Sequence, residues 1–129
     1  MAVDQAETKP QPIRRRILVV DDSADNATSL AALLKVLGHD VRVAYSAAEA
    51  IEAAEQFRPG VILTDLNMPE MDGYEATRRI RSQPWGRSIL ICAVTGCDTQ
   101  EHFYRSREAG IDHHLLKPLD LRLLNVILH

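Results

Sequence analysis

The sequence predicts a doubly wound α/β fold, in which a five-stranded parallel sheet is covered by five helices. Short apolar runs rich in β-branched residues alternate with segments of helical periodicity along nearly the whole chain. These runs are almost uniformly apolar, as expected for parallel strands that are buried on both faces. The segments between them are long enough to hold the helical crossovers that parallel strands need.

Five segments have the length and composition of strands. They are residues 17–20, 41–45, 61–64, 89–94 and 114–116. The first helix carries leucines at helical spacing, stops at Gly38 and has Asp25 as a candidate cap. The second runs from a Ser46 cap to Phe57, and the others start near Tyr74, lie within 99–109 and cover 119–128.

The 129 residues have the length of one domain. Residues 1–13 are polar and predict a flexible tail, which leaves 14–129 for the domain. The net charge of -3 argues against a nucleic-acid partner. No apolar run approaches the roughly 20 residues of a membrane span, and no secretory signal is recognisable, so a cytoplasmic protein is expected.

Polar side chains follow four of the five predicted strands. Asp21 and Asp22 follow the first, Asp65 the third, Thr95 the fourth and Lys117 the fifth. In doubly wound sheets, ligands bind beyond the carboxyl ends of the strands, where the winding direction reverses. Three carboxylates at close quarters repel one another, and a divalent cation relieves that repulsion. Ligands that are all oxygen suit Mg²⁺.

Asp65 is the candidate nucleophile, because it stands alone at the end of an apolar strand. A carboxylate beside a metal, an amine and a hydroxyl is equipped for phosphoryl transfer, in which charge on the phosphoryl oxygens must be neutralised. Lys117 would supply a positive charge, and Thr95 would donate its hydroxyl to a phosphate oxygen.

These residues resemble the receiver domain of two-component response regulators, and the resemblance covers residues 16–128. Its signatures are Ile17-Leu18-Val19-Val20-Asp21-Asp22, Thr64-Asp65-Leu66-Asn67-Met68-Pro69, Met71-Asp72-Gly73, Val94-Thr95-Gly96 and Leu115-Leu116-Lys117-Pro118. The resemblance implies a flavodoxin-like strand order, 2-1-3-4-5. The chain would be either a single-domain regulator or the receiver of a hybrid histidine kinase.

The resemblance also implies a phosphorelay function. Asp65 would accept a phosphoryl group from a histidine kinase or a histidine phosphotransfer protein. Asp22, Asp65 and the Asn67 backbone carbonyl would ligate Mg²⁺, with Asp21 acting largely through water. Such a domain catalyses only its own phosphorylation and dephosphorylation. Its downstream partners commonly meet the face made by helix four, strand five and helix five, and the domain itself would be a monomer or a weak dimer.

One position departs from the commonest receiver pattern. Many receivers have Tyr or Phe three residues before the lysine, and that ring turns inward when the threonine moves toward the phosphate. Here the residue is His114. The expected switch pair is therefore Thr95 and His114, with an imidazole in place of the usual aromatic ring.

Two other functions compete with this interpretation. Phosphatases with an aspartyl nucleophile have an Asp-x-Asp motif, whose second acid acts on the leaving group. Here that second acid is replaced by Asn67. A receiver-like interaction module that is never phosphorylated is the other alternative, and uptake of phosphate from acetyl phosphate with Mg²⁺ would distinguish it.

Overall fold

The computed structural model describes residues 14–66, 73–95, 100–117 and 119–128, with only the backbone of 100–103. Five parallel strands form one sheet in the order β2-β1-β3-β4-β5. Their bounds are β1 Arg16–Val20, β2 Asp40–Ala44, β3 Val61–Thr64, β4 Leu90–Thr95 and β5 His113–Leu116. The predicted flavodoxin-like order is thus confirmed. The predicted tail, residues 1–13, lies outside the described residues.

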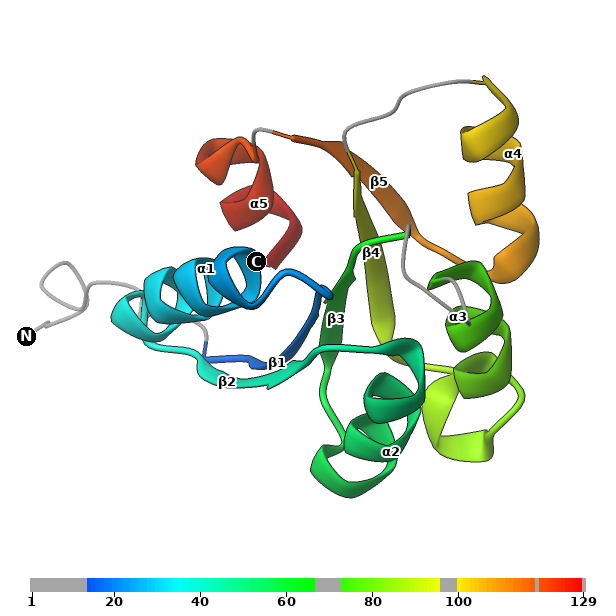
Figure 1. Cartoon of the computed structure of the whole chain (residues 1–129), viewed down its shortest axis with the longest axis horizontal. Helices are drawn as coiled ribbons and strands as arrows, with labels where there is room; N and C mark the ends of the chain where they lie inside the picture. The colour runs from blue at the N-terminus through cyan, green and yellow to red at the C-terminus, as the bar shows by residue number, and fades with distance from the viewer. Residues whose placement is uncertain (1–13, 67–72, 96–99, 118, 129) are drawn as a thin grey trace, which may run out of the picture.

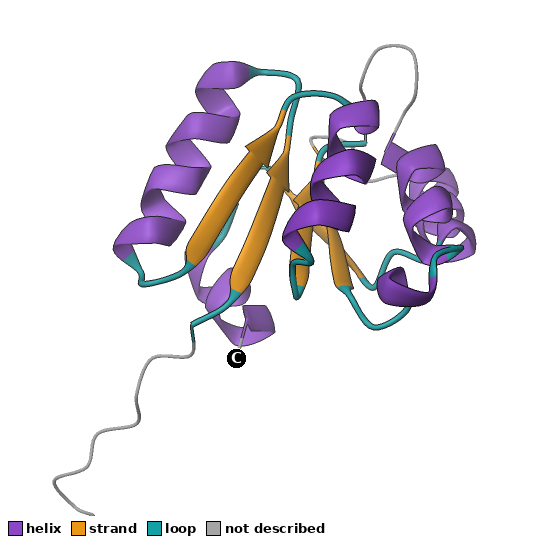
Figure 2. Cartoon of the chain, turned by 90° about the horizontal axis from the view of Figure 1, so that it is seen from below, coloured by secondary structure: helices purple, strands orange, loops and turns teal. Residues whose placement is uncertain are grey.

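Five α-helices cover the sheet on both faces (Figures 1 and 2). They are α1 Ala24–Val36, α2 Ala47–Phe57, α3 Gly73–Arg81, α4 Gln100–Ala109 and α5 Leu121–Leu128. Helices α1 and α5 lie on one face, and α2, α3 and α4 lie on the other (Figure 1). Among the described residues, no helix is both long enough and apolar enough to cross a membrane.

Alternate residues of each strand belong to two separate apolar cores. In β1, Ile17 and Val19 pack with α1 and α5, whereas Leu18 and Val20 pack with α2 and α3. All four side chains are at most 2% exposed. Since both faces are buried, the strands read as continuous apolar runs rather than as an alternation of apolar and polar residues.

Capping explains where the first two helices begin and end. The Ser23 side chain accepts a hydrogen bond from the Asn26 N–H, so Ser23 is the α1 cap and the prediction of Asp25 was wrong. Asp25 lies instead in the first turn, where its negative charge interacts favourably with the helix dipole. Ser46 caps α2 as predicted. Gly38 follows α1 with φ of 99°, a conformation that favours glycine.

The thiol of Cys92, in β4, is fully buried and reduced. Burial, aided by the nearby Asp112 carboxylate, raises the pKa of the Cys92 thiol to about 12. The side chain is therefore a neutral, apolar part of the core at physiological pH.

Two arginines cover the buried ring of Phe57 at the last turn of α2. The guanidinium of Arg16, at the start of β1, lies 4.3 Å from the ring centre, and that of Arg42, in β2, lies 4.8 Å away. Arg16 also approaches Asp40 at 3.9 Å. These cation–π contacts attach α2 to β1 and β2.

The structure differs from the sequence-based expectation at a few element boundaries. β1, β2 and β5 each begin one residue earlier than expected, β4 is shifted by one residue, and α5 begins at Leu121 rather than at 119. A short 3-10 helix, η1, at Pro84–Gly86 was not predicted. In α5, Leu124 and Leu128 are buried, whereas Leu121 and Val126 are exposed, so its apolar residues are only partly core.

Gly86 lies where no side chain fits, and this gives a prediction about stability. A Cβ at Gly86 would overlap the carbonyl group of Ile80, whereas a Cβ at Gly60 would meet nothing within 4 Å. Gly86→Ala should lower the free energy of unfolding by about 1–3 kcal/mol. Gly60→Ala, the matched control, should change it by less than about 1 kcal/mol. Urea denaturation measures both variants, and equal effects would contradict the packing argument.

Candidate functional site

The winding of the sheet reverses between β1 and β3, and the candidate site lies at their carboxyl ends. Val20 and Thr64, the last residues of the two strands, are register partners. The Asp65 N–H donates to the Val20 carbonyl at 2.9 Å, and the Asp21 N–H donates to the Ala44 carbonyl at 3.1 Å. The sheet's own hydrogen bonding therefore continues one residue further and fixes the backbone of both aspartates.

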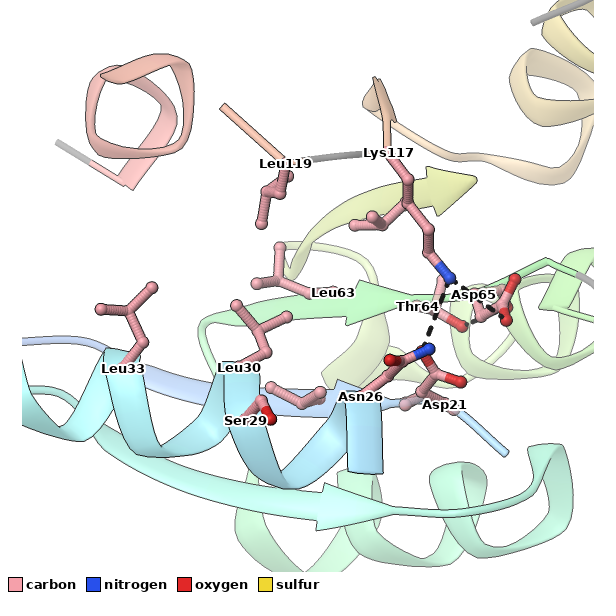
Figure 3. Close-up of a pocket in the computed structure, with 13 residues that line it drawn as sticks. Asp21, Asn26, Ser29, Leu30, Leu33, Leu63, Thr64, Asp65, Lys117 and Leu119 are labelled. Carbon is pink, nitrogen blue, oxygen red and sulfur yellow. Dashed lines mark hydrogen bonds and ion pairs between the residues drawn. The ribbon is translucent and has the colours of Figure 1, made fainter. Parts of the chain in front are cut away.

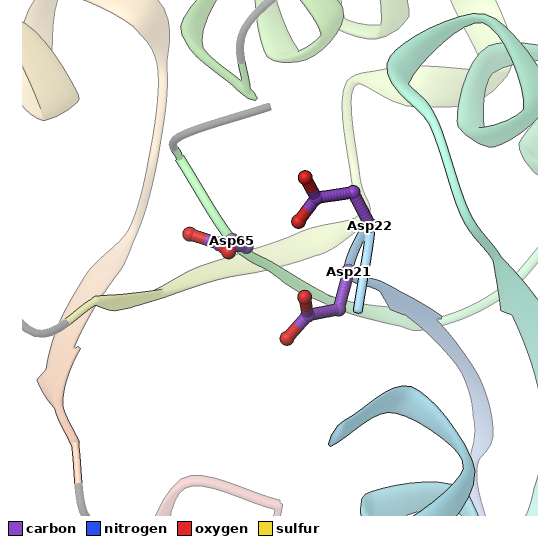
Figure 4. A group of neighbouring side chains, drawn as sticks. All are labelled: Asp21, Asp22 and Asp65. Atoms are coloured by element: carbon purple, nitrogen blue, oxygen red, sulfur yellow. The ribbon is translucent and has the colours of Figure 1, made fainter. Parts of the chain in front are cut away.

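Three carboxylates meet at this edge. One oxygen from each of Asp21, Asp22 and Asp65 lies within 4.8 Å of the other two, as Figure 4 shows for the three side chains. The side chains of Asp21 and Asp65 are only 11% and 13% exposed, while Asp22 faces solvent. The Ser23 N–H donates to Asp21 Oδ1 at 2.9 Å and so orients that carboxylate. Carboxylates this close repel one another, and the burial of Asp21 and Asp65 strengthens their mutual repulsion.

Lys117 compensates part of this negative charge. Its Nζ lies 3.7 Å from Asp21 Oδ2 and 3.8 Å from Asp65 Oδ2, between the two acids (Figure 3). Its backbone N–H donates to the Thr95 carbonyl at 2.8 Å, which holds the start of the lysine's loop against the end of β4. One amine facing three carboxylates leaves the site with net negative charge, which a divalent cation would neutralise.

The donor set fits Mg²⁺. All three clustered side chains offer oxygen, and no His or Cys belongs to the cluster among the described residues. Magnesium prefers one or two carboxylates and keeps several waters, so a half-open site with one exposed acid suits it better than a closed cage does. The predicted fourth contributor, the Asn67 carbonyl, lies outside the described residues.

Two further residues hold the Asp65 backbone in place. The Thr64 hydroxyl donates to the Asp65 carbonyl at 2.9 Å. Gly73, at the start of α3, packs so closely that a Cβ there would lie 2.6 Å from the same carbonyl. The Gly73 N–H also donates to the Leu66 carbonyl at 3.1 Å. Gly73 belongs to one of the sequence signatures, but its role was not predicted, because it depends on the close approach of the Asp65 carbonyl.

A cavity of about 340 Å³ extends from the acids along α1 (Figure 3). Asp21, Asp65 and Lys117 line one end of it. The rest is lined by α1, by the sheet and by the segment before α5, and its apolar residues include Leu30, Leu33 and Leu119. We call this apolar part the α1 arm. Helical periodicity predicts that Leu30 and Leu33 belong to one helix, but it does not separate a packed face from a cavity wall.

The two predicted switch residues lie on neighbouring strands. Thr95 ends β4 and is 1% exposed. His114 lies on β5, is half-buried and pairs in register with Ala93 of β4. The structure thus brings together Asp21, Asp22, Asp65 and Lys117, and it places Thr95 at the adjacent strand end.

Comparison with known proteins shows the family of the chain. The family model described as "Response regulator receiver domain" matches residues 17–129. The protein PilH of Pseudomonas aeruginosa is 32% identical over 117 residues, which cover 88% of this chain and 97% of PilH. The sensor histidine kinase RcsC of Escherichia coli is 36% identical over 108 residues, which cover 84% of this chain but only 11% of RcsC.

A solved structure is also similar. The receiver domain of the sensor histidine kinase PA1611 from Pseudomonas aeruginosa superposes with a TM-score of 0.81 and 36% identity, covering 90% of this chain and 95% of that one. That structure is described with a magnesium ion coordinated in the active-site cleft. Together with the observed fold, the match over 17–129 shows that this chain belongs to the response regulator receiver domain family and acts in two-component phosphorelay signalling.

Proposed function

We propose that Asp65 is the phosphoacceptor of this receiver domain and that it takes the phosphoryl group from a phosphohistidine of a histidine kinase or a phosphotransfer protein. The observation that carries the proposal is the placement of the Asp65 carboxylate, 3.8 Å from the Lys117 amine and beside two further acids. Asp65 is also the member of the acidic cluster that the structure holds by its backbone from three sides, through Val20, Thr64 and Gly73.

The transfer replaces one bond to phosphorus with another. A carboxylate oxygen of Asp65 attacks phosphorus, an oxygen–phosphorus bond forms as the nitrogen–phosphorus bond breaks, and the donor imidazole leaves with the electron pair and takes a proton. Charge on the phosphoryl oxygens needs compensation during this step. Lys117 supplies part of it, and Thr95 is the proposed hydroxyl donor. As for the family, this chemistry would serve the domain's own phosphorylation and dephosphorylation rather than turnover of a free substrate.

Mg²⁺ is the proposed cofactor. Asp22 and Asp65 would hold it directly, with Asn67 through its carbonyl and Asp21 through water. When bound, the ion supplies positive charge for the phosphoryl oxygens. We assign the reaction to the cytoplasm, where the ATP that charges histidine kinases is made.

The α1 arm gives the donor a place to contact the domain. It opens beside Asp65 and Lys117, and it is lined by leucines on the far side from the acids. A donor that presents its histidine to Asp65 would bury apolar side chains against this lining, which contributes to binding in proportion to the apolar area removed from water.

The proposed readout of phosphorylation lies on the face made by α4, β5 and α5. Exposed apolar residues gather on these elements: Tyr104, Leu116, Leu121, Leu123 and Val126. Thr95 and Lys117 border the site and are joined by a hydrogen bond at the ends of β4 and β5. We infer that a shift of Thr95 toward the phosphoryl group is passed through His114 and β5 to this face, where a downstream partner binds.

The first prediction concerns the acceptor. With acetyl phosphate and Mg²⁺, the intact mass of the wild type should rise by one phosphoryl group, and Asp65→Asn should stay unlabelled. Asp40→Asn, which removes a surface carboxylate outside the cluster, is the matched control and should label like the wild type. Equal labelling of the wild type and Asp65→Asn would refute the assignment. A folded, Mg²⁺-bound wild type without label would favour the interaction module.

The second prediction concerns magnesium. Asp22→Asn removes a charged ligand and should weaken Mg²⁺ binding by at least about tenfold. Lys117→Met removes a nearby positive charge and should strengthen binding by about threefold to tenfold, a modest gain because water screens the half-exposed amine. Amide shifts of residues 22 and 65 during Mg²⁺ titration measure both. Asp25→Asn, an exposed acid outside the cluster, should leave the affinity unchanged.

The third prediction concerns the readout. Phosphorylation should alter amide hydrogen exchange in α4, β5 and α5 more than in α2, which lies on the opposite side of the sheet from α5 and away from β5. Asp65→Asn treated with the same donor is the control. Unchanged exchange on α4, β5 and α5, with full phosphoryl occupancy verified by mass, would count against this face as the output surface.

A further inference from the structure

A second hollow lies at the amino ends of the strands, whereas Asp65 lies at a carboxyl end. It has a volume of about 530 Å³ and is formed by the end of α3, the segment after η1, the start of β4, the last turn of α4 and the loop before β5. Three arginines, Arg81, Arg87 and Arg107, and a single acid, Asp112, contribute the charged side chains of its lining. The hollow is therefore locally positive, although the chain carries a net charge of -3.

Arg81 and Asp112 form a salt bridge in the lining of the hollow, and their charges cancel. Arg81 Nη2 lies 2.7 Å from Asp112 Oδ2, which also accepts the Ile91 N–H at 2.9 Å. The remaining Arg81 nitrogens donate to main-chain carbonyls, including Gly110 at 3.0 Å and Ile89 at 2.7 Å. The only acid of the lining is thus already paired, and it is unable to offset the charge of the other two arginines.

Arg87 and Arg107 are the uncompensated charges. Both side chains are exposed, and within the part of the chain that the structure describes neither guanidinium forms a hydrogen bond or an ion pair. Arg107 lies in the last turn of α4, where it interacts favourably with the helix dipole. Arg87 has no comparable role. Guanidinium groups present paired donors that match the oxygens of a phosphate, and two of them carry the charge of its dianion.

We propose that this hollow is a binding site for a small phosphate monoester. Arg87 and Arg107 hold the phosphate, and the organic part contacts Ser88 and the Arg81–Asp112 salt bridge. The site is independent of the phosphoacceptor, because it lies at the amino ends of β4 and β5 whereas Asp65 lies at the carboxyl end of β3. The volume of about 530 Å³ is in the range of sites that bind small ligands.

The test uses ribose 5-phosphate and inorganic phosphate as probes, without Mg²⁺. Each is titrated into the labelled protein at constant ionic strength, and amide shifts of Ser88, Gly110 and Asp65 are followed. The expected result is a saturable shift at Ser88 and Gly110, none at Asp65, and at least threefold tighter binding of ribose 5-phosphate. No saturable shift at Ser88 and Gly110, or shifts confined to Asp65, would overturn the proposal.

A matched pair of double variants separates a built site from overall charge. Arg87→Gln with Arg107→Gln should weaken the binding of ribose 5-phosphate at least fivefold. Arg78→Gln with Arg79→Gln removes the same charge from exposed arginines on α3 that face Glu75 at 3.4 and 3.1 Å, and it should leave binding within twofold. Equal losses in the two double variants, both shown to be folded by circular dichroism, would overturn the proposal.

Discussion

The chemistry of this protein depends on one feature of the fold, the side-by-side placement of the ends of β1 and β3. The chain passes from β1 outward to β2 and then returns to the other side of β1, so two strands far apart in sequence become neighbours. Their register makes Val20 and Thr64 partners, and the next residues are aspartates on both strands. A slip of one residue in this pairing would turn one carboxylate toward a core.

The order of the strands determines both how close the carboxylates lie and how far the Lys117 side chain must extend to contact them. β5 is separated from β3 by β4, so Lys117 must extend past the end of β4 to lie between Asp21 and Asp65. Its hydrogen bond to Thr95 ties the base of that side chain to β4. The charge balance of the site therefore depends on the position of β5, and β5 is also the edge strand on the proposed output face.

Much of the fold followed from sequence because its strands are buried on both faces and stand out as apolar runs. The candidate site followed because parallel strands end at one edge, so Asp21, Asp22, Asp65 and Lys117 were brought together by topology alone. Contacts between distant segments were not predictable. In the sequence Arg81 resembles any basic residue in the last turn of a helix, yet it bonds to Asp112 and to the carbonyls of Gly86 and Gly110. The choice of Ser23 over Asp25 as a cap depended on where α1 starts, which periodicity fixes only to within a few residues.

Charged side chains protect the β2 edge of the sheet against pairing with another strand. On β2, the exposed side chains are those of Asp40 and Arg42, and Arg42 is held over Phe57 by its ring contact. An incoming strand would have to pair beside these charges, and charged side chains on an edge strand oppose such pairing. The growth of the sheet by accretion of further chains, which is the first step toward cross-β aggregation, is therefore disfavoured on the β2 side by the same arginine that fastens α2.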